Sequence, residues 1–454
     1  MKTSLLKQWF SAIMLASGLG LAAAVPTITL TAELEKGVLP ANARQDALIK
    51  ISIFAPPDTS PKPVKKARVN LAVVLDRSGS MGAQMKLEKA KEAAITAVNM
   101  LGPDDLFSLV VYDDNAETVI PACPVTGDMK ERIVSRIREI RTGGSTALFA
   151  GVSIGSNEVR KNSRENFVNR IILLSDGLAN VGPSSPQELG RLGASLIKEK
   201  ISVSTVGVGS DYNEDLMTAL SQNSDGNFYF VENSRDLPNI FSKELGAALQ
   251  VAAKSIRVKI VCPEGVKPKG ILGHECRING NTIEMTFNQV YSGHEKSLIL
   301  QLETPPKPDG ASEQLATVML DYASIADNRE QRIQKQIVAA YSASDKVVAT
   351  NLNKKVQAEV AVQQSAVMRD EALKQADKGN FEAAKNTLQQ AAQKLESTAR
   401  ETGNAELKKQ ADTLYERQNE LDKSKDDAQQ YNVSRKRIRG ESYQMKNSQV
   451  YQQQ

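Results

Sequence analysis

Asp76, Ser78 and Ser80 place three oxygen-bearing side chains at alternate positions of one short segment, Leu75–Met81. On a tight turn, which Gly79 permits, side chains two residues apart can face a single point. Carboxylate and hydroxyl oxygens arranged in this way suit a hard cation such as Mg²⁺. The alternative is an Asx-type turn that only caps the following helix.

Two further loops carry oxygen donors. Thr146 ends a Gly-Gly-Ser-Thr sequence ahead of a predicted helix at Leu148, and Asp176 follows a run of apolar residues. In open parallel sheets, ligands bind where the loops at the carboxyl ends of the strands meet. We therefore expect both residues at the edge that carries the first three donors. The candidate metal ligands are Asp76, Ser78, Ser80, Thr146 and Asp176.

The elements that position these loops follow from the hydrophobic pattern of residues 68–253. Leu71–Leu75 and Ile171–Leu174 are apolar at every position, as strands covered on both faces are. Such runs alternate with helix-length segments, which predicts a doubly wound, mostly parallel α/β sheet. The predicted strands are 69–75, 106–112, 168–174, 201–208 and 228–231, and the predicted helices are 86–101, 130–140, 148–159, 186–198, 215–222 and 237–251.

These loop residues resemble those of a known family. Asp-x-Ser-x-Ser at 76–80, the distant Thr146 and the Asp-Gly pair that begins at Asp176 resemble the metal-ion-dependent adhesion site of von Willebrand factor type A domains. The resemblance covers roughly residues 68–250 and includes all five ligand positions. It implies a type A domain over residues 68–253.

The resemblance also implies a role for each donor. Mg²⁺ takes about six oxygens and keeps some of its water, and Mn²⁺ or Ca²⁺ could use the same donors. Neutral hydroxyls and indirect carboxylates leave the ion one open position, which a Glu or Asp of a partner protein can fill. The hydroxyls that would bind the ion are Ser78, Ser80 and Thr146, and the carboxylates that would contact it directly or through water are Asp76 and Asp176.

The rest of the sequence offers no catalytic constellation. The two histidines, His274 and His294, lie outside the α/β segment, which argues against His-dependent hydrolysis and a His-rich zinc site. No Gly-Lys-Ser/Thr phosphate loop occurs. We therefore expect a binding protein with no catalytic residue. A net charge of +4 over 454 residues gives no basic footprint for nucleic acid either.

Strict alternation of apolar and polar residues flanks the α/β segment on both sides. Ile28–Leu34 shows it before the segment, and Ile256–Ile260 and Ile283–Phe287 show it afterwards. Period two indicates half-buried strands. We predict that residues 25–67 and 254–325 form one β-sandwich into which the α/β domain is inserted, an order similar to that of bacterial exported type A proteins.

The first 24 residues are typical of a secretory signal. A basic start precedes the apolar run Trp9–Leu21 and three alanines that end at Ala24. The run is shorter than the ~20 residues of a membrane-spanning helix, so cleavage is favoured over a retained anchor. We expect an exported chain, periplasmic or secreted to the cell surface, without an integral membrane span. Cys262 and Cys276 could pair in that oxidising compartment.

The C-terminal part changes composition again. Residues 326–428 are rich in Ala, Gln, Lys and Glu, and Ala376–Phe381 resembles the turn of a helical hairpin, either a surface or coiled-coil hairpin or one tetratricopeptide-type unit. Residues 429–454 are Gln-rich and basic at Arg435–Arg437, and we predict that they are disordered. A rival function follows, in which the chain is an envelope assembly or scaffold protein that acts mainly through this helical region.

Overall fold

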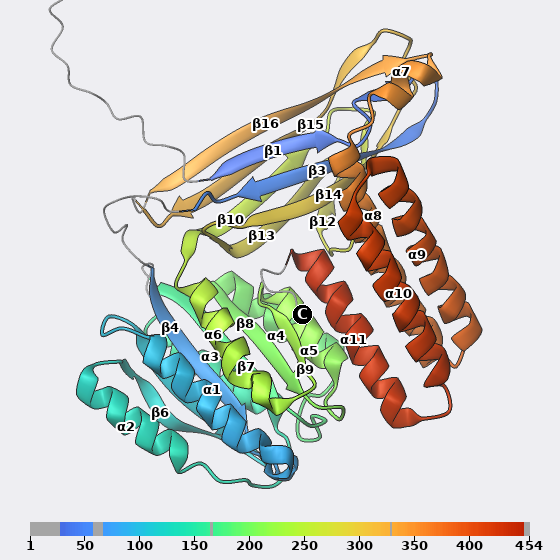
Figure 1. Ribbon diagram of the computed structural model, residues 1–454. Coiled ribbons are helices and arrows are strands. Elements are labelled where there is room, and N and C mark those ends of the chain that lie inside the picture. Colours follow the sequence, from blue (N-terminus) through green and yellow to red (C-terminus); the bar gives the residue numbers. More distant parts are fainter. Residues whose placement is uncertain (1–27, 58–66, 164–166, 327–328, 449–454) are drawn as a thin grey trace, which may run out of the picture.

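The computed structural model describes residues 28–57, 67–163, 167–326 and 329–448. The predicted signal at residues 1–24 lies outside these ranges. The described chain forms an α/β domain, a two-sheet β-sandwich and a layer of C-terminal helices (Figure 1).

The sheet of the α/β domain has the strand order β6-β5-β4-β7-β8-β9. Five of the strands are parallel, and β6 pairs antiparallel with β5 at one edge. The predicted doubly wound α/β fold is confirmed, although the sequence pattern gave no strand at β6. The strands are β4 (Arg68–Asp76), β5 (Leu106–Tyr112), β6 (Ala116–Pro124), β7 (Phe167–Ser175), β8 (Ile201–Val208) and β9 (Phe228–Val231).

Helices cover both faces of this sheet because alternate side chains of the central strands point to opposite sides. On β4, Leu71 and Val73 pack in the core beneath α1, α2 and α6, while Ala72 and Val74 pack beneath α3, α4 and α5. The helices are α1 (Lys86–Met100), α2 (Gly127–Arg138), α3 (Leu148–Arg160), α4 (Pro186–Leu196), α5 (Glu214–Asn223) and α6 (Leu237–Ala248), and short 3₁₀ segments are η1 (Gly79–Met85), η2 (Ile197–Glu199) and η3 (Ser234–Asp236).

Strands from both sides of the α/β domain build the sandwich. β3 pairs antiparallel with β14 along its whole length, which joins the segment before the inserted domain to the segment after it. The two sheets have the orders β1-β3-β14-β11 and β12-β13-β10-β15-β16-β2 and share one apolar core. The strands are β1 (Thr29–Leu34), β2 (Val38–Pro40), β3 (Gln45–Phe54), β10 (Val251–Val261), β11 (Lys267–Ile271), β12 (Arg277–Asn279), β13 (Thr282–Tyr291), β14 (Glu295–Thr304), β15 (Ser312–Ser324) and β16 (Glu330–Ser342).

One prediction about the sandwich is wrong, and one possibility that the sequence left open is not realised. Residues 330–342 form strand β16 and not the start of the helical region, because Ile337, Ala339 and Tyr341 alternate into the sandwich core. Cys262 and Cys276 are both free thiols. Cys262 is buried in the sandwich core, whereas Cys276 is only partly buried at its margin.

Four packed helices follow the short helix α7 (Asp345–Thr350), and α8 and α9 are joined at the turn that the sequence predicted. Apolar residues from all four helices form one cluster, so the region is more than one hairpin. None of the helices in the described ranges is both long and apolar enough to cross a membrane. The four are α8 (Lys354–Asp377), α9 (Phe381–Thr402), α10 (Ala405–Lys423) and α11 (Ala428–Asn447).

Helix α11 overturns the prediction of disorder for residues 429–447; residues 449–454 lie outside the described ranges. Its basic side chains bind acidic groups of the α/β domain, where Arg435 pairs with Asp215 at 2.6 Å and Lys436 pairs with Glu214 at 2.8 Å. Tyr443 donates a hydrogen bond of 2.8 Å to the carbonyl of Gly226. The helix lies along β9 (Figure 1), held by ion pairs that local composition does not reveal.

Candidate metal centre

Three loops meet at the carboxyl edge of the parallel sheet. Asp76 is the last residue of β4, and the segment after it is joined by backbone hydrogen bonds to the loop before α3. Gly79 N donates to Gly144 O at 2.9 Å, and Gly143 N donates to Arg77 O at 2.6 Å. These bonds fix the two loops against each other without using any side-chain oxygen.

The third loop approaches both of them at Gly177. A Cβ atom at this glycine would lie 3.3 Å from Thr146 Oγ1 and 3.5 Å from Ser80 Oγ, so the two hydroxyls face the same small space. Asn180 accepts a hydrogen bond of 2.8 Å from Thr146 N and holds the third loop to the second. A side chain in place of Gly177 would fill the space between the hydroxyls.

The remaining candidate residues complete this group of oxygens. Ser78 Oγ lies 3.1 Å from Ser80 Oγ, and Ser80 Oγ donates to Asp176 Oδ1 at 2.7 Å. Asp76 accepts hydrogen bonds from Ser78 N and Ser175 Oγ, both at 2.8 Å. All five residues that the sequence predicted therefore lie together, with Ser80 exposed and the other four buried.

The electrostatics of this group favour a cation. Burial raises the pKa of Asp76 to about 6, the nearby charge of Asp176 raises it further, and hydrogen bonds from Ser78 and Ser175 lower it in part. A raised carboxyl pKa means that the ionised form is poorly compensated in the cation-free site. Two buried carboxylates beside three hydroxyls are a donor set that fits a hard divalent cation.

Lys86 is a part of the centre that sequence reasoning missed. It is the first residue of α1, is 6% exposed, and its Nζ lies 2.7 Å from Asp176 Oδ2. A lysine at the start of a helix is ordinarily solvated, so its type gives no signal. The ammonium group compensates Asp176, which leaves Asp76 as the carboxylate without a cationic partner among the described residues.

Cation binding at this site should weaken below about pH 6. Protons compete with the cation for Asp76, whose pKa is about 6 in the cation-free protein. Above this pH the carboxyl is ionised and the affinity should be constant; below it, the apparent dissociation constant should rise about tenfold per pH unit. Calorimetric titration with Mg²⁺ from about pH 5 to 8 measures this. A constant affinity in folded protein would exclude Asp76 as a ligand.

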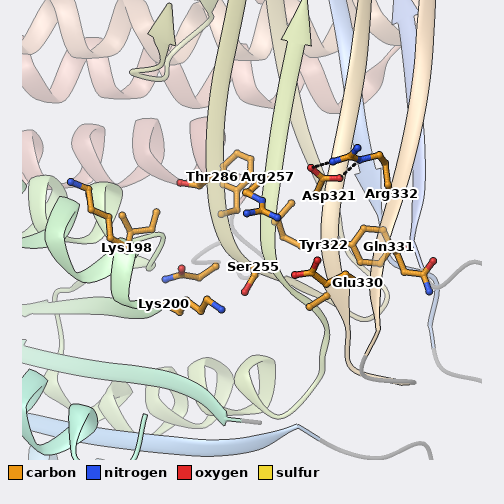
Figure 2. Close-up of a pocket in the computed structure, with 15 residues that line it drawn as sticks. Lys198, Lys200, Ser255, Arg257, Thr286, Asp321, Tyr322, Glu330, Gln331 and Arg332 are labelled. Atoms are coloured by element: carbon orange, nitrogen blue, oxygen red, sulfur yellow. Dashed lines mark hydrogen bonds and ion pairs between the residues drawn. The ribbon is translucent and has the colours of Figure 1, made fainter. Parts of the chain in front are cut away.

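A separate cleft lies between the α/β domain and the sandwich. It has a volume of about 500 Å³ and separates the amino edge of the α/β sheet, at Lys198 and Lys200, from the sandwich. Figure 2 shows Arg332 on its far wall, where it binds both carboxylate oxygens of Asp321 at 2.5 and 3.1 Å. None of the five candidate ligands lines this cleft, so it is separate from the metal centre.

The α/β segment is similar in sequence to a known family and to bacterial proteins. The family model of the von Willebrand factor type A domain matches residues 70–243. The chain is 26% identical to the uncharacterised protein YfbK of Escherichia coli K12 over 48% of its own length and 37% of the relative's. It is 30% identical to an uncharacterised protein of Synechocystis over 44% of its own length and 45% of the relative's. The match spans less than half the length of either relative.

Two solved structures are similar over most of the chain. A von Willebrand factor type A protein from Catenulispora acidiphila matches with a TM-score of 0.70 and 16% identity, covering 87% of this chain and 90% of that one. The ArnB paralog VWA2 from Sulfolobus acidocaldarius matches with a TM-score of 0.62 and 18% identity, covering 92% of this chain and 99% of that one. At these identities the likeness concerns the fold.

Proposed function

Because residues 70–243 form a von Willebrand factor type A domain, we propose that the chain is an exported, Mg²⁺-dependent binding protein that captures an Asp or Glu side chain of another protein. Domains of this family are commonly protein-interaction modules and often bind a metal at an adhesion site. The observation that carries the proposal is the convergence of three hydroxyls and two buried carboxylates at one sheet edge.

Each donor has a role in this proposal. The hydroxyls of Ser78, Ser80 and Thr146 would bind the ion, and Asp76 and Asp176 would hold it directly or through water. When bound, the ion supplies a Lewis-acidic position for a partner's carboxylate. Arg77 does not compete for that carboxylate, because it pairs with Asp113 at 2.8 Å and Glu117 at 2.9 Å.

The position of the edge supports binding of a macromolecule. The chain enters β4 from the side of the sandwich and runs away from it, so the carboxyl end of β4 lies at the far end of the α/β domain (Figure 1). Ser80, Gly143 and Gly144 are exposed there. A protein partner can therefore approach without contacting the sandwich. The signal-like pattern of residues 1–24 supports the exported location.

Water proton relaxation with Mn²⁺ in place of Mg²⁺ tests the proposal. We expect bound Mn²⁺ to lose relaxivity when the peptide GSGEGSG is added, because its carboxylate replaces a coordinated water. Both peptides end in a C-terminal amide, so the matched peptide GSGQGSG carries no carboxylate and should leave the relaxivity unchanged. Asp76→Ala should abolish Mn²⁺ binding, whereas Asp104→Ala, at a side chain 77% exposed on the loop before β5, should leave it intact.

Two results would contradict the proposal. If Mn²⁺ binds but GSGEGSG changes nothing, the site has no open position for a carboxylate. If Asp76→Ala still binds the peptide, the binding surface lies elsewhere, and the rival function through helices α8–α11 is favoured.

A further inference from the structure

The carboxyl edge of the α/β sheet, which carries the five candidate ligands, is called the metal edge below. Two apolar side chains on this edge are the most exposed large hydrophobic residues among those the structure describes. Met85 is 61% exposed and Leu178 is 60% exposed, and the others reach at most 51%. Isolated exposed apolar residues are ordinary on a protein surface. These two are notable because they belong to two different loops of the same site.

Both residues lie close to the candidate ligands. Leu178 directly follows Gly177, the residue that separates the hydroxyls of Thr146 and Ser80. Met85 ends η1, five residues after Ser80 and directly after a kink at Ala83 and Gln84. Met85 also directly precedes Lys86, whose Nζ contacts Asp176. The two apolar side chains therefore stand on the rim of the centre.

The backbone at Met85 has a conformation that is unfavourable for a residue with a side chain. Gln84 and Met85 have φ angles of +51° and +55°, a left-handed region that residues other than glycine rarely adopt. Ser234 Oγ donates a hydrogen bond of 3.1 Å to Gln84 O and helps to fix the turn. Strain of this kind clusters at sites that bind ligands. Here the strained turn displays a methionine to solvent where a glycine would be unstrained.

Two cationic side chains beside the candidate ligands are already paired with carboxylates. Arg77 is engaged by Asp113 and Glu117, and Lys86 is engaged by Asp176. The large apolar contacts that the rim offers are those of Met85 and Leu178. We propose that the metal edge recognises a carboxylate carried on an apolar segment, with aliphatic or aromatic residues of the partner packed on these two side chains. This inference rests on the proposed function and specifies its partner.

Two peptides with the same central glutamate test the inference on the full chain. In Mg²⁺, GLGEGLG should bind at least tenfold more tightly than GSGEGSG, as measured by titration calorimetry. The double variant Met85→Asn, Leu178→Ser should bind both peptides equally, because asparagine tolerates the left-handed backbone but has no apolar side chain to offer. Its Mg²⁺ uptake should match that of the parent, which shows that the site is folded.

A matched control removes apolar side chains elsewhere. Ile278→Ser, Val338→Ser acts on sandwich residues that are 43% and 51% exposed, and it should preserve the tenfold preference. Equal binding of both peptides by the parent would overturn the inference and leave carboxylate capture standing. A preference that persists in the Met85, Leu178 variant or in chelator would also overturn it. If neither peptide binds while Mg²⁺ uptake is intact, the proposed function itself fails.

Discussion

Replacing Glu244 with alanine should destabilise the α/β domain by about 3–5 kcal/mol, because it leaves the Arg170 guanidinium buried without its counter-charge. Both side chains are 0% exposed, and they form an ion pair between α6 and β7. Asn227 and Tyr229 each donate a hydrogen bond of 2.8 Å to the same carboxylate. All of these groups lose their charged acceptor in the variant.

Native-state hydrogen exchange on peptides from β7 and β8 measures this effect where it arises. A chain with three parts is not expected to unfold in one step, so a local measurement is preferable to a single melting temperature. Glu92→Ala is the matched control, because its carboxylate is 52% exposed and pairs with Lys89 on the surface of α1. It should change stability by less than about 0.5 kcal/mol. A loss below about 1 kcal/mol for Glu244→Ala would contradict the prediction.

The same ion pair restricts how the domain can move. Glu244 lies on α6, the last helix before the chain returns to the sandwich, and Arg170 also donates a hydrogen bond of 2.7 Å to Tyr291 of β13. Any sliding of α6 along the sheet would separate two buried charges. Binding at the metal edge must therefore either leave α6 in place or supply enough free energy to break this pair.

The sequence predicts that the five candidate ligands lie together, because the signals for this are local. The apolar run of β4 identifies a central strand, and the positions of Asp76 and Asp176 at strand ends place both at one sheet edge. The structure adds that the backbone at Gly177 passes close to the hydroxyls of Thr146 and Ser80. Short spacing and strand order are enough to bring these residues together.

The features that the sequence does not predict depend on distant partners. Residues of α11 look like a disordered tail by composition, yet Arg435 and Lys436 find acidic groups more than 200 residues away. Nothing in the sequence around Lys86 indicates that its ammonium group is buried against Asp176. For β16 the signal was present, because Ile337 and Tyr341 keep the strand period within an Ala- and Gln-rich segment.

Replacing Lys86 with methionine should destabilise the cation-free protein by about 3 kcal/mol and tighten Mg²⁺ binding at least tenfold. The variant leaves Asp176, which is 0% exposed, as a second buried carboxylate without a cation. Mg²⁺ then has two carboxylates to compensate and no ammonium group to repel it, and unit charges about 4 Å apart interact by about 4 kcal/mol at an effective dielectric constant of 20. The cation should therefore restore the lost stability.

Native-state hydrogen exchange on peptides from α1, in chelator and in Mg²⁺, measures the stability of parent and variant, and calorimetric titration with Mg²⁺ measures the affinity of each. Lys89→Met is the matched control on the same helix, since Lys89 pairs with Glu92 on the surface and should affect neither stability nor affinity appreciably. If Lys86→Met binds Mg²⁺ more weakly, the lysine positions Asp176 for the ion and does not compete with it. If the affinity rises as expected, Lys86 acts as an internal counter-charge that keeps the empty site folded, and cation uptake must displace its charge from Asp176.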